Sequence, residues 1–186
     1  MKTLNISCSL FFSLFFFFSC SHIDKDGRKE YREKLRANNF EQAEKTFLKL
    51  DLATNEKSLL LFYMERGLFF HLKKDYAQSN DFLLKAQKKA VELYTTRISG
   101  KLAKYTGNDQ QDFYYGENYE KSMIFYYMAL NFFLLYEQNN DITDLRKAKS
   151  NLLAWDSTLK TIKNENLGES VFKEDLLAKI LDADFF

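Results

Sequence analysis

Residues 61–91 read LFYMERGLFFHLKKDYAQSNDFLLKAQKKAV, and their spacing predicts two antiparallel helices joined by a tight turn. Small residues stand where the helices would come closest, at Gly67 in the first and Ser79 in the second. Larger side chains occupy positions that would fill the space beside them. The whole pattern comprises Tyr63, Gly67, Phe70, Asp75, Tyr76, Ser79, Leu83 and Ala86. We therefore expect Gly67 and Ser79 to allow a close approach of the two helices.

This pattern is similar to the tetratricopeptide repeat, in which antiparallel helix pairs stack into a solenoid. Two weaker copies flank it. The first covers residues 39–47 and follows a short polar segment that suits the end of a stack. The other covers residues 124–153, where Ala129 or Asn131 would be the position of close approach. The resemblance implies an all-α fold, with antiparallel helix pairs stacked as a short tetratricopeptide-like solenoid.

Helical spacing continues through most of the chain, while glycine is sparse and no strand-like alternation is sustained. Breaks rich in Asn, Asp and Gly separate the helical segments, and these breaks take the place of the proline that usually ends such a repeat. Asp75, Asn118 and Asp141 are expected to cap the helices that follow them. The predicted helices cover residues 26–37, 40–51, 56–73, 76–104, 117–138, 142–163 and 169–183.

Residues 1–19 have the composition of a secretory signal peptide. A short basic start precedes a nearly apolar run at residues 10–18, and no acidic residue is present. A helix of that length rises only about 14 Å, roughly half of a bilayer core. The run is therefore too short to span a membrane, and Ser19 and Cys20 end it before the sequence becomes polar.

The residues Phe17-Phe18-Ser19-Cys20 resemble the lipobox of bacterial lipoproteins, in which the cysteine thiol receives a diacylglyceryl group and the signal is cut before it. The resemblance implies lipid attachment at Cys20, with palmitate among the expected acyl groups. Two or three acyl chains would give a stable membrane anchor. By analogy, Ser21 favours the periplasmic face of the outer membrane. An ordinary cleaved signal with a coincidental cysteine, and an uncleaved anchor, are the alternatives.

These features predict four parts. Residues 1–19 are the signal peptide, 20–25 the lipidated tether, 26–163 the helical repeat domain, and 164–186 a linker with a C-terminal helix. Cys8 would leave with the signal, so the mature chain would have neither a free thiol nor a disulfide.

The middle of the chain contains the segments Tyr115-Gly116-Glu117-Asn118-Tyr119-Glu120-Lys121 and Tyr126-Tyr127-Met128-Ala129-Leu130-Asn131. Their order and spacing, within residues 35–155, resemble a family of uncharacterised bacterial lipoproteins with tetratricopeptide-like helical repeats. This resemblance implies the same architecture and brings no known activity.

The charge balance gives no sign of nucleic-acid binding, since 27 Lys and Arg stand against 26 Asp and Glu in 186 residues. The sequence holds no catalytic triad pattern, no glycine-rich phosphate loop and no HExxH motif. His22 and His71 each stand without a second ligand at suitable spacing. We therefore expect no enzyme, no catalytic residue, no bound metal and no cofactor.

Residues 113–120 read FYYGENYE and form the segment that most resembles a binding site. Tyrosine readily makes contact surfaces, and Gly116 allows close approach of a backbone. The candidate partner-contact residues are Tyr114, Tyr115, Glu117 and Tyr119. In the alternative interpretation, Glu117 and Glu120 stabilise the first turn of the next helix through its dipole, while the tyrosines pack as a lid.

Residues 123–136 predict a helix that is apolar nearly all round and too short to span a membrane. A core helix is expected there, with a partner groove or an apolar ligand pocket as the alternative, and a buried Asn131 would need a hydrogen-bond partner. For the whole chain we expect a membrane-anchored periplasmic lipoprotein that acts as a protein-binding scaffold or adaptor in an envelope assembly. The alternative is a binding module for an apolar small molecule or lipid.

Overall fold

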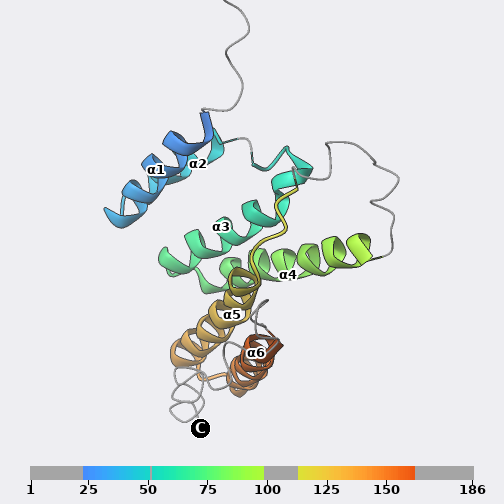
Figure 1. Cartoon of the computed structure of the whole chain (residues 1–186). Coiled ribbons are helices and arrows are strands. Elements are labelled where there is room, and N and C mark those ends of the chain that lie inside the picture. The colour runs from blue at the N-terminus through green and yellow to red at the C-terminus, as the bar shows by residue number, and fades with distance from the viewer. Residues whose placement is uncertain (1–22, 51, 99–112, 162–186) are drawn as a thin grey trace, which may run out of the picture. The chain divides into compact units, whose positions relative to one another are not determined.

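A computed structural model describes residues 23–50, 52–98 and 113–161, and helices are the regular elements of these residues, with no strand among them (Figure 1). The all-α prediction is confirmed for this part of the chain. The elements are α1 (Ile23–Arg36), α2 (Phe40–Leu48), the 3-10 turn η1 (Glu56–Ser58), α3 (Leu59–Leu72), α4 (Tyr76–Ile98), α5 (Asn118–Asn139) and α6 (Ile142–Thr161). The predicted signal peptide, Cys20 and the helix at 169–183 lie outside the described residues. The chain divides into two compact units, residues 1–51 and 52–186.

The predicted helix boundaries differ from the observed ones mainly at three places. Helix α1 begins at Ile23, within the segment predicted as a tether. The helix predicted at 56–73 opens with the tighter turn η1 before α3 begins. The helix predicted at 40–51 ends earlier, at Leu48. Helix α4 is described as far as Ile98, and the rest of the helix predicted at 76–104 lies outside the described residues.

Two of the three predicted helix caps are confirmed. The Asp75 side chain accepts a hydrogen bond from the Gln78 backbone N–H at 3.1 Å, and Asp141 accepts one from Thr143 at 2.8 Å. The prediction that Asn118 is a cap is wrong, because Asn118 is the first residue of α5 and Glu117 occupies the cap position.

The first unit is a helical hairpin of α1 and α2. Its turn contains Asn38 with φ of 55°, a left-handed conformation that asparagine tolerates, and the Asn39 side chain then caps α2 through the Gln42 N–H at 3.3 Å. Tyr31 and Phe47 are buried with their ring centroids 5.0 Å apart, and they join the two helices. The weak copy predicted at 39–47 thus lies on the second helix of a pair.

The second unit begins with the hairpin of α3 and α4. At its closest approach, the buried Ser79 hydroxyl donates to the Gly67 carbonyl at 2.7 Å. A β-carbon on Gly67 would lie 2.6 Å from Leu83 Cδ2, closer than atoms pack. The prediction that Gly67 and Ser79 allow this approach is therefore confirmed, since a larger residue at 67 would displace the Leu83 side chain.

Replacing Gly67 with alanine should lower the free energy of unfolding by about 1–2 kcal/mol, because overpacking against Leu83 exceeds the gain in helix propensity. Urea denaturation checks this. The double variant Gly67→Ala/Leu83→Ala should lose less than the sum of its two single variants, since the smaller residue at 83 makes room. Strict additivity would contradict the clash.

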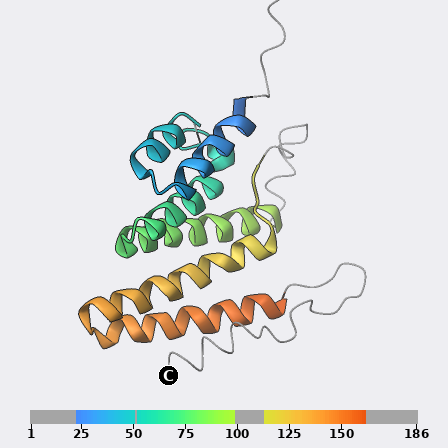
Figure 2. The same ribbon diagram turned by 90° about the vertical axis from the view of Figure 1, so that its left-hand side faces the viewer.

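In the rest of the second unit, α5 is packed between α4 and α6 (Figure 2). Toward α4, Ile124 and Met128 of α5 join a core cluster with Leu83. Toward α6, Ala129 packs in a second cluster with Trp155. Because α5 has neighbours on two sides, it is apolar nearly all round, and the expected core helix at 123–136 is found.

Candidate functional site

Residues 113–117 are held against the start of α3 before α5 begins. The Tyr114 backbone N–H donates to the Lys57 carbonyl at 2.9 Å, and the Lys57 ammonium lies 6.0 Å from the Phe113 ring centroid. Gly116 has φ of 65°, in the left-handed region that glycine adopts without strain, so glycine is favoured at the reversal into α5. The backbone thereby places the Tyr114 side chain beside the first turn of α5.

The Tyr114 hydroxyl donates to Glu120 Oε2 at 2.7 Å, and the same oxygen accepts the Glu117 backbone N–H at 2.8 Å. Glu120 is the third residue of α5, so its carboxylate satisfies a backbone N–H at the cap of that helix. Burial, the hydrogen bond to Glu120 and the charges of Glu120, Glu65 and Glu117 all raise the pKa of Tyr114. Tyr114 is therefore a hydrogen-bond donor at neutral pH.

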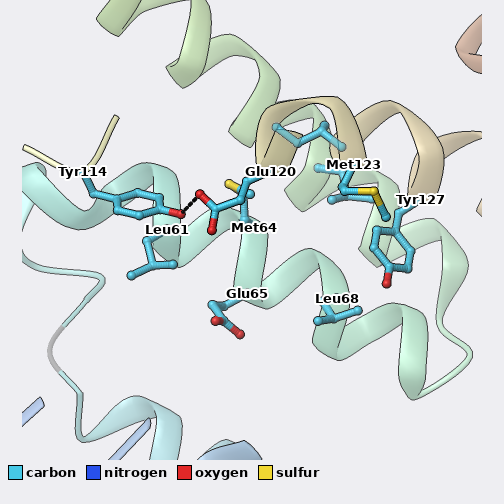
Figure 3. A pocket seen from close by; sticks show the side chains of 10 residues that line it. Leu61, Met64, Glu65, Leu68, Tyr114, Glu120, Met123 and Tyr127 are labelled. Atoms are coloured by element: carbon cyan, nitrogen blue, oxygen red, sulfur yellow. Dashed lines mark hydrogen bonds between the residues drawn. The ribbon is translucent and has the colours of Figure 1, made fainter. Parts of the chain in front are cut away.

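A pocket of about 140 Å³ opens next to this pair (Figure 3). The Tyr114–Glu120 pair lies at one end of the pocket and Tyr127 at the other. Helix α3 contributes four side chains, α5 another four, and α4 only Leu83. The lining residues are Leu61, Met64, Glu65, Leu68, Leu83, Tyr114, Glu120, Met123, Ile124 and Tyr127.

The same spacing occurs on both helices that form the pocket. Positions 61, 64, 65 and 68 of α3 and positions 120, 123, 124 and 127 of α5 each follow i, i+3, i+4, i+7. That spacing places four side chains on one face of a helix. The pocket is thus formed by matching faces of the first helices of two consecutive helix pairs.

The predicted contact residues fall in different surroundings. Tyr114 lines the pocket. Tyr115 is half-buried against the cluster of α3, α4 and α5, while Glu117 is exposed at the cap of α5 and Tyr119 is 50% exposed on its first turn. The structure therefore brings Tyr114 together with Glu120 in the pocket, and it places the other three candidates around the start of α5.

The α3 side of the pocket was not predicted from the sequence. From the sequence, this side has the spacing of a face that packs into the core, and a pocket face has the same spacing. Its residues are Leu61, Met64, Glu65 and Leu68. The one available signal is Glu65, a carboxylate on an otherwise apolar face. A charge at such a position favours a solvent-accessible hollow over a dry core.

Behind the pocket, a buried polar network connects α3, α4 and α5. The Asn131 amide nitrogen donates to Ser79 Oγ at 2.8 Å and to Asn80 Oδ1 at 2.9 Å. The Asn131 oxygen lies 2.6 Å from His71 Nδ1, which must then carry the hydrogen. Asn131 thus has the structural partners that its burial requires, and the His71 ring packs on Tyr127 of the pocket with centroids 5.0 Å apart.

Removal of the Tyr114 hydroxyl should change the alkaline stability of the protein. In the folded state Tyr114 holds its proton more tightly than in the unfolded chain, so the stabilisation is complete below the ordinary tyrosine pKa of about 10 and is lost as the pH rises above it. Urea midpoints measured between about pH 8 and pH 11 should fall less steeply in Tyr114→Phe than in the parent chain. Equal slopes would contradict this role of Tyr114.

In the described ranges, no group of three His, Cys, Asp or Glu residues could hold a metal ion. None of the helices found there is both long and apolar enough to cross a bilayer. The chain matches no model of a known protein family, no curated protein and no solved structure. The function is therefore argued from the geometry of the pocket.

Proposed function

We propose that this chain is a membrane-anchored periplasmic lipoprotein that binds another protein as a scaffold or adaptor in an envelope assembly. The observation that carries the binding role is the pocket formed by matching faces of α3 and α5. A partner segment lying along these two helices would place one side chain in the pocket. Tyr114 would contact that segment directly, and Tyr115, Glu117 and Tyr119 are the further contacts proposed at the start of α5.

The repeat architecture supports this binding role. Two consecutive hairpins, α3–α4 and α5–α6, pack through α4 and α5, and the first hairpin has the small-residue contact of Gly67 and Ser79. We infer a short tetratricopeptide-like stack from this arrangement. Stacks of that kind present an extended concave surface, lined by successive repeats, to protein partners.

The size of the pocket favours a protein segment over a lipid. A cavity of about 150 Å³ accepts a molecule the size of benzene, whereas pockets for drug-sized ligands span roughly 300–1,000 Å³. The observed 140 Å³ is close to the first of these volumes and matches one side chain better than an acyl chain of membrane length. The binding module for an apolar small molecule or lipid is accordingly the weaker proposal.

Membrane attachment is proposed through Cys20, with the outer membrane favoured. The Cys20→Ser variant should move from the membrane fraction to the soluble periplasmic fraction, because it lacks the thiol that would receive the lipid. Cell fractionation and immunoblotting measure this, with Cys8→Ser as the matched control that should stay in the membrane. Membrane retention of Cys20→Ser would contradict the lipoprotein proposal.

The scaffold and the lipid carrier are separated by two measurements on the full chain. In-cell crosslinking followed by mass spectrometry should trap the same protein partner in repeated preparations. Native mass spectrometry of the Cys20→Ser chain, purified without a delipidation step, should find no lipid in the pocket. Bound lipid together with the absence of a crosslinked protein would overturn the scaffold proposal.

A further inference from the structure

The sulfur-containing side chains of the described residues gather at the pocket. They are Met64, Met123 and Met128, because both cysteines of the chain lie outside the described ranges. Met64 lines the pocket from α3 and Met123 lines it from α5 (Figure 3). Met128 is only 7% exposed and packs in the core cluster that includes the lining residues Leu83 and Ile124. Two of the three described thioethers therefore line a single pocket.

Met64 and Met123 occupy equivalent positions on the two walls of this pocket. Each is the second of the four residues that its helix contributes in the spacing i, i+3, i+4, i+7. Both side chains are half-buried, whereas Met128 is buried. A small oxidant dissolved in water therefore reaches the two pocket methionines more readily than it reaches Met128.

We propose that Met64 and Met123 form an oxidation site, at which a peroxide converts their thioethers to sulfoxides and thereby closes the pocket to its partner. The proposal rests on the protein-binding function and adds a regulation of the same site. Hydrogen peroxide gives one oxygen atom to each sulfur, so that an S–O bond forms while the O–O bond breaks. The sulfur lone pair supplies the two electrons, a proton moves to the leaving oxygen, and the peroxide is reduced to water.

Sulfoxide formation changes the pocket in two ways. It turns a flexible apolar side chain into a polar one, so a partner side chain would meet a dipole that it cannot satisfy. It also adds an oxygen atom on each of two walls of a space of only about 140 Å³. Both changes weaken binding. Methionine sulfoxide reductases reverse the modification, so the pocket would reopen after reduction.

Timed exposure of the purified full chain to hydrogen peroxide tests the oxidation step. Peptide mapping by mass spectrometry should find sulfoxide at Met64 and Met123 about tenfold sooner than at Met128, because only Met128 is buried. In urea, where the chain is unfolded, the three residues should react at similar rates. Oxidation of Met128 as fast as that of the pocket methionines in the folded chain would overturn the proposal.

Photocrosslinking in cells from position 68, which lines the same pocket, measures the consequence for binding. A pulse of hydrogen peroxide should lower capture of the partner by the parent chain about tenfold. Met64→Leu/Met123→Leu keeps apolar side chains of similar volume, so its capture should not change with the pulse. Met128→Leu is the matched control and should stay as sensitive as the parent chain. Mass spectrometry of the recovered chain confirms which methionines are oxidised.

Two results of the pulse would overturn the oxidation site and leave the protein-binding function standing. The first is an equal loss of capture in the parent chain and in Met64→Leu/Met123→Leu, since the sensitivity would then lie in the partner. The second is unchanged capture by a parent chain that carries both sulfoxides. Absence of any captured protein from position 68 before the pulse would overturn the binding function and the oxidation site together.

Discussion

Replacing Asn131 with alanine is expected to lower the free energy of unfolding of the second unit by about 3 kcal/mol. Asn131 is fully buried and makes hydrogen bonds to Ser79, Asn80 and His71. The alanine variant would leave polar groups of the buried Ser79 and Asn80 and of the half-buried His71 without this partner, and it would also leave a small cavity. Because these three hydrogen-bonding residues lie on α3 and α4, the loss would loosen the packing of α5 on the α3–α4 hairpin.

Trp155 fluorescence during urea denaturation measures this effect, since Trp155 is the one tryptophan of the chain and packs in the core between α5 and α6. Asn151→Ala is the matched control, because the Asn151 amide donates to the Lys147 carbonyl on its own helix and lies near the surface. That control should change stability by less than about 0.5 kcal/mol. A loss below about 1 kcal/mol in Asn131→Ala would contradict the importance of the network.

Filling the pocket should weaken partner binding without unfolding the chain. Met123 lines the pocket and is only half-buried, so Met123→Trp would place an indole in the space of about 140 Å³. We expect the affinity for the partner to fall at least tenfold, which is about 1.4 kcal/mol, because the inserted side chain of the partner would lose its site. The amount of partner crosslinked in cells, and then titration of the purified pair, measure the loss.

The control for pocket filling is Leu153→Trp, which adds the same side chain at an exposed position of α6. This variant should bind the partner as the parent chain does. Both tryptophan variants should unfold within a few degrees of the parent chain, which separates loss of binding from loss of structure. Normal partner capture by a folded Met123→Trp variant would place the binding site elsewhere.

The sequence predicted the local features of the fold better than the position of the site. Gly67 and Ser79 identify a close helix approach because only small residues permit it, and Asp75 and Asp141 identify helix starts because their side chains bond to nearby N–H groups. Asn118 was misassigned as a cap, since the reversal at Gly116 and the carboxylate of Glu120 move the cap to Glu117.

The site was predicted in part. The segment 113–120 was identified by its tyrosines and glycine, and it supplies Tyr114 and Glu120 to the pocket. The other wall, on α3, lies at least 50 residues before α5 in the sequence, and only the packing of two helix pairs brings it there. The Glu120 carboxylate accepts the N–H at the cap of α5, as the helix-start interpretation expects, and it also lines the pocket.

Site-specific photocrosslinking in cells tests the protein-binding pocket most directly. A photoreactive amino acid placed at position 68 or 123, in the pocket, is compared with one placed at position 91 or 153, which are exposed on α4 and α6. The predicted result is capture of one and the same protein from positions 68 and 123, and no capture of that protein from positions 91 and 153. Capture of that protein from positions 91 or 153 but not from the pocket would contradict the proposed function.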